Sequence, residues 1–280
     1  MLREANFMIL VVASGKDVAA VNIAEQILIH YRFEKTTESF QENPVYTAKI
    51  KGREVKLITL TEESVYAQYL TDFFKPALIV FISRHSSKSG TPTLSVHTPG
   101  NIGEAKLGGL PRKVSFSPAN AMRDALRAMM RLKDEMNLNY EVSYECTHHG
   151  PSLDVPAMFT ELGSSLRQWK DSKAAEAVAH ATIEAVSKFG QSQTAAVLGI
   201  GGPHYNEKFS RMALRDEIAF GHMIPKYAVS SVDVDILEQC VERTLEEVEL
   251  VVLDWKGIKG NHKPKLIAMV NEIGLSMKKV

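Results

Sequence analysis

The chain has 280 residues, of which 45% are hydrophobic and 24% charged, and its 33 basic and 33 acidic side chains give a formal net charge of zero. This apolar content can bury a core, which excludes an intrinsically disordered chain. The 17 glycines and 11 prolines exclude collagen-like and low-complexity classes. A zero net charge gives no global indication of a nucleic-acid or membrane partner. Nine histidines are a mild excess.

The first half of the chain alternates between strand and helix patterns. The expected elements are, in order, a strand at 7–13, a helix at 18–30, a hairpin of strands at 45–50 and 54–60, a short helix at 62–74 and a strand at 77–82. Residues 83–117 follow and are rich in Ser, Gly, Pro, Thr and His. Because loops this long are uncommon in compact domains unless they are functional or disordered, we expect an active-site loop here.

The second half continues the alternation. Its expected elements are helices at 118–136, 172–189, 207–216, 233–247 and 263–273, strands at 140–147, 194–198, 218–221 and 250–254, and a short strand at the C-terminal end. Strands that alternate with helices indicate an α/β fold, layered as α/β/α around a mixed, mostly parallel sheet. We expect one catalytic domain over residues 1–280, with a two-lobed arrangement left open.

Cysteine usage and hydropathy predict a cytoplasmic protein. Cys146 and Cys240 are far apart and form neither a disulfide framework nor a CxxC pair. The apolar run at 7–13 is short for a signal peptide and follows the acidic Glu4, so a buried strand is expected instead. No apolar stretch approaches the roughly 20 residues that cross a bilayer, so no membrane partner is expected.

Histidines gather where predicted strands end. Six of the nine lie there, in Ser-, Gly-, Thr- or Pro-rich contexts: His85, His97, His148, His149, His204 and His222. Ligands of α/β proteins bind beyond the carboxyl ends of the strands, so these histidines are expected to share one pocket.

Two kinds of chemistry fit such a pocket. Neutral imidazoles bind zinc, and Glu145, three residues before His148, would add a ligand or a general base. No HExxH or CxxC spacing is present, so general-base catalysis by histidine with backbone oxyanion donors stays open. Neighbouring residues of a strand point to opposite faces, so His148 and His149 are expected to have different roles.

Charge is unevenly distributed along the chain. Residues 83–133 hold nine basic and two acidic side chains, whereas residues 232–254 hold eight acidic and one basic. Arg123, Arg127 and Arg131 recur on one face of the helix at 118–136. They form either a solvated helix face or a stripe that binds phosphates. The opposite face is expected in the core and carries Met122, Ala125, Met129 and Leu132.

Five motifs resemble one known family. They are Ser83-Arg-His-Ser-Ser87, Glu145-Cys-Thr-His-His-Gly-Pro151, Glu161-Leu-Gly-Ser164, Phe220-Gly-His-Met-Ile-Pro-Lys-Tyr227 and Asp254-Trp-Lys-Gly257. With them the chain resembles the D-aminoacyl-tRNA deacylases of the archaeal and plant type over nearly its whole length. The resemblance implies a phosphorylase/hydrolase-like α/β fold, zinc as the cofactor, and hydrolysis of the ester between a D-amino acid and tRNA. It also implies a broad amino-acid scope.

Together, the resemblance and the residues predict the site. The catalytic candidates are Glu145, His148, His149 and His85. The candidate zinc ligands are His85, His148, His149, His204 and Glu145. The candidate substrate-binding residues are Arg84, Ser86, His97, His222, Lys226, Arg123, Arg127 and Arg131. We expect water activated by zinc or by histidine, the acceptor end of tRNA as partner, no DNA partner and a monomer. A zinc amidase or peptidase and a non-catalytic tRNA-binding protein are the alternatives.

Overall fold

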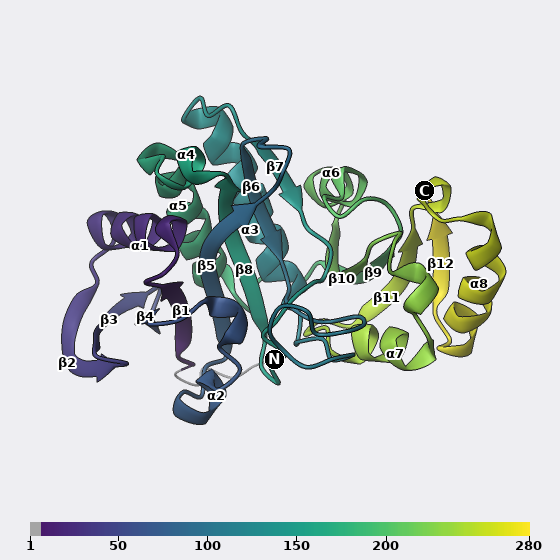
Figure 1. Ribbon diagram of the computed structural model, residues 1–280, viewed down its shortest axis with the longest axis horizontal. Helices are drawn as coiled ribbons and strands as arrows, with labels where there is room; N and C mark the ends of the chain where they lie inside the picture. The colour runs from purple at the N-terminus through teal and green to yellow at the C-terminus, as the bar shows by residue number, and fades with distance from the viewer. Residues whose placement is uncertain (1–6) are drawn as a thin grey trace.

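The computed structural model describes residues 7–280; Glu4 lies outside this range. Its strands form two sheets, a larger one at the left of Figure 1 and a smaller one at the right. The larger sheet contains β1 (Ile9–Ser14), β2 (Glu34–Phe40), β3 (Asn43–Ile50), β4 (Arg53–Leu60), β5 (Leu78–Ser86), β6 (Thr93–His97), β7 (Glu141–Tyr144) and β8 (Ala157–Ser164). The smaller contains β9 (Ala195–Ile200), β10 (Ile218–Ile224), β11 (Val248–Leu253) and β12 (Ser276–Lys279).

Strand pairing confirms the mixed, mostly parallel α/β architecture. The larger sheet has the order β2-β3-β4-β1-β5-β8-β6-β7, with the central strands β4, β1, β5 and β8 parallel to one another. β6 runs antiparallel to β8 and parallel to β7. The smaller sheet, in the order β10-β9-β11-β12, is parallel throughout.

Helices cover the sheets in layers. They are α1 (Val18–His30), α2 (Leu70–Phe73), α3 (Ala119–Glu135), α4 (Leu166–Trp169), α5 (Ser172–Lys188), α6 (Glu207–Arg215), α7 (Val234–Glu242) and α8 (Lys263–Glu272). α1, α3 and α5 pack on one face of the larger sheet, and the short α2 together with Leu153 and Val155 helps cover the other. The smaller sheet lies between α3 and α6 on one side and α7 and α8 on the other.

The core matches the predicted apolar face of α3. Met122, Ala125 and Met129 are fully buried and Leu132 is nearly so. The same core cluster holds side chains of both sheets, including Val197 of β9. The two sheets therefore share one packed interior through α3.

Three strands differ from the predictions. β2 is an exposed, polar edge strand that lacks an apolar face, and β6 lies inside the segment 83–117 that was expected to be loop. β8 is central and fully buried, yet it carries polar residues that interrupt its apolar pattern. The expected helix at 62–74 is a 3₁₀ turn, Ser64–Tyr66, followed by α2. Within residues 7–280, no helix has both the length and the apolar character needed to cross a bilayer.

Candidate active site

The site lies on one face of β5 and β8. Alternate residues of a strand share a face, so Ser83 and His85 of β5 stand beside Glu161 and Gly163 of β8. A Cβ at Gly163 would lie 2.6 Å from the His85 side chain, so this glycine makes room for the imidazole. Because β6 runs antiparallel to β8, it delivers His97 opposite Phe159, two residues from Glu161. The site therefore lies over the middle of β8 rather than beyond the ends of parallel strands.

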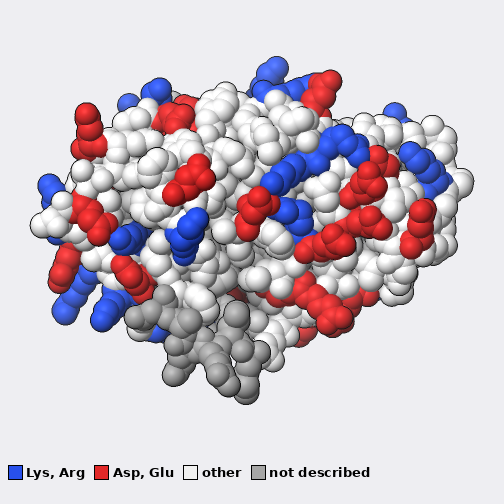
Figure 2. Space-filling view, turned by 90° about the horizontal axis from the view of Figure 1, so that it is seen from below, with Lys and Arg blue, Asp and Glu red and all other residues white. Residues whose placement is uncertain are grey.

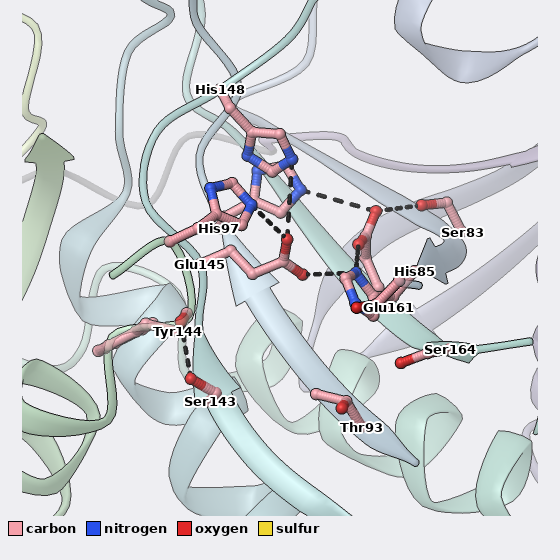
Figure 3. A network of polar contacts seen from close by, with 12 residues as sticks. Ser83, His85, Thr93, His97, Ser143, Tyr144, Glu145, His148, Glu161 and Ser164 are labelled. Carbon is pink, nitrogen blue, oxygen red and sulfur yellow. Dashed lines mark hydrogen bonds and ion pairs between the residues drawn. The ribbon is translucent and has the colours of Figure 1, made fainter. Parts of the chain in front are cut away.

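Loops bring the remaining groups to this face. Residues 145–149 follow β7, and His204 follows β9 of the smaller sheet. Cys146 N donates to the His204 carbonyl (2.9 Å), which fixes one loop against the other. Figure 3 shows His97, His148, Glu145, His85 and Glu161 converging on one network. Five of the six predicted histidines meet here.

Glu145 is the hub of the network. Its carboxylate is buried and accepts from His204 Nε2 at 3.0 Å, while His85 Nδ1 lies 3.1 Å from its other oxygen. Burial by itself would raise the pKa of Glu145, but hydrogen bonds from His204 and His85 outweigh it and hold the pKa well below its usual value. Glu145 is therefore an ionised carboxylate inside the protein.

His85 is the cation that balances the buried carboxylates. Its Nδ1 lies 3.6 Å from Glu161, which also accepts a 2.6 Å hydrogen bond from Ser83 Oγ. Burial opposes the charged form, yet Glu145 and Glu161 raise the pKa of His85 to about 10. Both carboxylates face Nδ1 of His85, so this ring suits charge balance and orientation of the carboxylate pair.

Three other histidines present free Nε2 atoms. In each, Nδ1 faces a backbone carbonyl: His148 that of Cys146 at 2.8 Å, His149 that of Gly150 at 2.7 Å, and His97 that of Thr98 at 3.3 Å. A donating Nδ1–H leaves Nε2 as the acceptor. Hydrogen bonds of this kind, made by the ring nitrogen that does not bind the metal, orient histidines that bind metals.

These three histidines fit a zinc ion. Their candidate ligand atoms lie within 4.8 Å of one another. Burial and the neighbouring histidines hold the pKa of His148 well below its usual value and lower that of His149 to about 4, so both rings are neutral. His97 Nε2 is buried without a hydrogen-bond partner among the described residues. Burial disfavours a charge there, but Glu161, 3.6 Å away, more than offsets this and raises the pKa of His97; the same carboxylate would favour a metal cation.

A second group of possible ligands overlaps the first. Glu145, His148 and His204 also place ligand atoms within 4.8 Å of one another. His204 Nε2 is already engaged by Glu145, however, and its Nδ1 lies 3.2 Å from the Tyr227 hydroxyl. The pattern of free lone pairs therefore favours the group that contains His97.

Two pockets open onto His148 and His149. One, of about 420 Å³, is lined by these two histidines, the other site residues except the fully buried His97, and Arg84, Ser86 and Leu107. The other, of about 750 Å³, is formed by residues of the loop 98–117 and by 225–231. His148, His149 and Leu107 line both pockets. A substrate with two parts can therefore reach the same histidines from two sides.

His148 and His149 do not point to opposite faces, as was expected. β7 ends at Tyr144, and His149 adopts a left-handed conformation with φ of 42°. The rings of His148 and His149 consequently turn to the same side, with centroids 4.2 Å apart. The expectation of opposite faces is wrong because the strand ends before it reaches them.

His222 lies outside both pockets. It is fully buried in β10, where Nδ1 lies 3.1 Å from the Thr147 hydroxyl and Nε2 faces the carbonyls of Ser115 and Arg243. This arrangement connects β10 to three segments, the loops that carry Thr147 and Ser115 and the turn after α7. A substrate-binding role is not supported, since the ring has no exposed surface. Lys226 is exposed but lines neither pocket.

The arginines of α3 do not form an open stripe. Arg123 is buried and donates to the carbonyls of Ala213 and Asp216 at the end of α6. Arg127 also donates to Ala213, and Arg131 pairs with Glu135 and Glu184. The prediction of a phosphate-binding stripe is therefore wrong. Arg123 and Arg127 instead cap α6, because the last carbonyls of that helix lack helical partners.

Glu161 begins one of the five motifs that carry the family resemblance, but it was not among the predicted site residues. This carboxylate lies in a strand of otherwise apolar and small residues, Ala157–Ser164, and contacts His85 and His97. The motif was the available signal, but the strand that holds it was not predicted. Arg84, which was predicted, donates its backbone N–H to Asp17 (2.7 Å) and pairs with Glu63 at the pocket wall.

Comparisons with known proteins agree on the family. The family profile described as D-aminoacyl-tRNA deacylase matches residues 72–278. The D-aminoacyl-tRNA deacylase of Pyrococcus abyssi is 37% identical over 96% of this chain and 98% of that protein. The protein of the same name from Methanosarcina mazei is 34% identical, over 98% and 93%.

A solved structure supports the same fold. The crystal structure titled conserved protein of unknown function AF0625 superposes with a TM-score of 0.86 at 30% identity, covering 98% of this chain and 95% of that one. Sequence and structure thus agree over nearly the full length. The chain belongs to the D-aminoacyl-tRNA deacylase family.

Proposed function

We propose that the protein hydrolyses the ester bond of D-aminoacyl-tRNA, releasing the free D-amino acid and tRNA. The observation that carries this proposal is that the ligand atoms of three histidines lie within 4.8 Å of one another beside an ionised, buried Glu145, with His148, His149 and Glu145 lining one pocket. The names of the relatives supply the substrate class. The large shared space around His148 and His149 supports a broad amino-acid scope.

His97, His148 and His149 are the residues that would hold zinc. A zinc ion held by these three imidazoles would supply a Lewis acid for a carbonyl oxygen and would lower the pKa of water to about 7. Glu145 is placed to accept the proton of the attacking water, because it is ionised and contacts His148 at 3.7 Å. His204, whose Nε2 lies 3.0 Å from Glu145, would pass a proton to the leaving ribose oxygen and take one back from Glu145. The C–O ester bond breaks as the acid and the ribose hydroxyl form.

Surface charge suggests where tRNA binds. At the right of Figure 2, acidic side chains lie next to a band of basic ones. The segment around α7 carries Asp233, Asp235, Glu238 and Glu242, and Asp233 pairs with Arg112. The acidic surplus of this segment would disfavour phosphates. Near the C-terminal end, in contrast, two lysines lie over the Trp255 ring, with the Nζ atoms of Lys263 and Lys279 at 4.3 and 4.1 Å from the ring centre.

These lysines are available for phosphates. Among residues 7–280, Lys263 and Lys279 have no acidic partner within 4.0 Å, and the same holds for the nearby Lys256 and Lys259. Gly257 packs against Gly202, two residues before His204. The lysine cluster, Lys256, Lys259, Lys263 and Lys279, thus adjoins the loop that carries a site residue, and we propose that it contacts tRNA backbone.

One assay separates the candidate functions. The protein is incubated with a D-aminoacyl-tRNA, the matching L-aminoacyl-tRNA and a short peptide. Release of the D-amino acid alone is expected. Peptide cleavage would instead support an amidase or peptidase, and tRNA binding without release would support a non-catalytic protein. The monomeric state and cytoplasmic location stay predictions.

A further inference from the structure

Outside the active site, a further cluster of metal-ligating side chains lies between α1 and α5. His30 is the last residue of α1, and Glu176 and His180 are four residues apart on α5, so they share one helix face. The three ligand atoms lie within 4.8 Å of one another. None of these residues lines either pocket of the active site. The cluster is therefore separate from the proposed catalytic chemistry.

The spacing of the cluster suits ligands of a shared ion. His30 Nε2 and His180 Nε2 lie 3.5 and 3.6 Å from the same oxygen, Glu176 Oε1. Direct N–H···O hydrogen bonds are shorter, about 2.7–3.2 Å. Two ligands held about 2.0–2.2 Å from one tetrahedral ion would be separated by roughly 3.3–3.5 Å. Both contacts are therefore long for hydrogen bonds and close to a ligand–ligand separation.

Surrounding contacts orient the donors. The Tyr31 hydroxyl lies 2.8 Å from His180 Nδ1, and if this nitrogen donates its proton, Nε2 keeps a free lone pair. The rings of His30 and His180 lie 5.0 Å apart at 58°, so their Nε2 atoms approach the carboxylate from different directions. About a third of each side chain is exposed, which leaves a fourth position to water.

We propose that His30, Glu176 and His180 form a surface site for a divalent transition-metal ion, most readily Zn²⁺, that clamps the end of α1 to α5. Two imidazoles and one carboxylate favour zinc, cobalt or nickel over magnesium and calcium, which take oxygen ligands. The ion would act on stability rather than on catalysis, because binding to the folded state alone stabilises it.

Zinc stoichiometry tests the proposal. Metal-stripped protein is dialysed against buffered zinc, and bound metal is measured for the wild type, Glu176→Gln, His180→Asn and the control His262→Gln, which changes a surface histidine outside the cluster. We expect each cluster variant to bind one equivalent fewer than the wild type and the control. Equal zinc content in the wild type and both cluster variants would overturn the proposal.

Two further readouts separate this site from the pocket. The Tm of the wild type is expected to rise more on zinc addition than that of Glu176→Gln, whereas hydrolysis of D-aminoacyl-tRNA stays the same in both. The variant His149→Ala, which changes the active-site pocket, should still bind one equivalent of zinc at the surface site. A wild type whose only zinc is lost in His149→Ala would contradict the second site while leaving the proposed function intact.

Discussion

Glu145 and His85 hold opposite charges at neutral pH because each is buried beside the other. The carboxylate keeps a low pKa and the imidazole a pKa of about 10, so neither titrates near pH 7. His148 and His149 remain neutral for the opposite reason, since burial and neighbouring rings disfavour their charged forms. Environment thus divides similar side chains into charged and neutral sets.

Replacing Glu145 by Gln tests its role as proton acceptor. The amide keeps the shape of the side chain but accepts protons poorly, so kcat is expected to fall by about 10²–10⁴ while KM changes little. Steady-state hydrolysis of D-aminoacyl-tRNA measures both constants. Glu184→Gln, on the surface of α5, is the matched control. A Glu145→Gln protein with a kcat near that of the wild type would exclude this role.

Because His222 is buried, we expect the folded protein to lose stability in acid. Burial lowers its pKa to about 4, below the unfolded value of about 6.5, so the unfolded chain binds the proton first. The stabilising contribution is complete above pH 6.5 and is lost as pH falls toward 4, to a total of about 3 kcal/mol. Urea unfolding at pH 7.5 and 5 should show a steeper loss in the wild type than in His222→Gln. Equal losses would remove His222 as a cause.

At the level of elements, the apolar periodicity of the sequence predicted the helices and strands whose apolar faces pack in the core. The helix at 18–30 was predicted with the bounds that α1 has, and α3, α5 and the hairpin of β3 and β4 were also predicted correctly. β6 and β8 were not, because buried contacts among Ser83, Glu161 and His97 replace the usual apolar pattern. The site histidines could be listed from the sequence, but their partner Glu161 depends on long-range strand pairing.

The arginines of α3 also show that spacing along the sequence does not reveal long-range contacts. Their spacing placed them on one face, but it gave no sign that α6 ends against that face. Arg123→Ala is expected to reduce the free energy of unfolding by about 2–4 kcal/mol, because it leaves buried carbonyls without donors. Arg131→Ala should cost less than about 1 kcal/mol, since its ion pairs are exposed. Urea denaturation measures both, and similar losses would contradict the capping role.

For the whole molecule, two sheets joined through α3 place the site residues at their junction. β5, β6 and β8 of the larger sheet supply His85, His97 and Glu161, and the loop after β9 of the smaller sheet supplies His204. The zero net charge hides an acidic surplus around α7 and a separate lysine cluster around Trp255. Neutrality therefore does not argue against an RNA substrate.

Charge reversal tests the lysine cluster. Lys263→Glu combined with Lys279→Glu should raise KM for D-aminoacyl-tRNA at least tenfold, and flatten its dependence on salt, with little change in kcat. Lys49→Glu and Lys51→Glu, on the hairpin of β3 and β4, provide a control of the same charge change. An unchanged KM would place the tRNA elsewhere on the surface.

The most direct test of the central claim measures D-aminoacyl-tRNA hydrolysis before and after metal removal. A chelator should abolish release of the D-amino acid, and added zinc should restore it in the wild type but not in a protein carrying His97→Ala and His149→Ala. Thermal unfolding of the double variant checks that it remains folded. Full hydrolysis by the metal-free wild type, or zinc-restored hydrolysis by the double variant, would contradict a metal held by His97, His148 and His149.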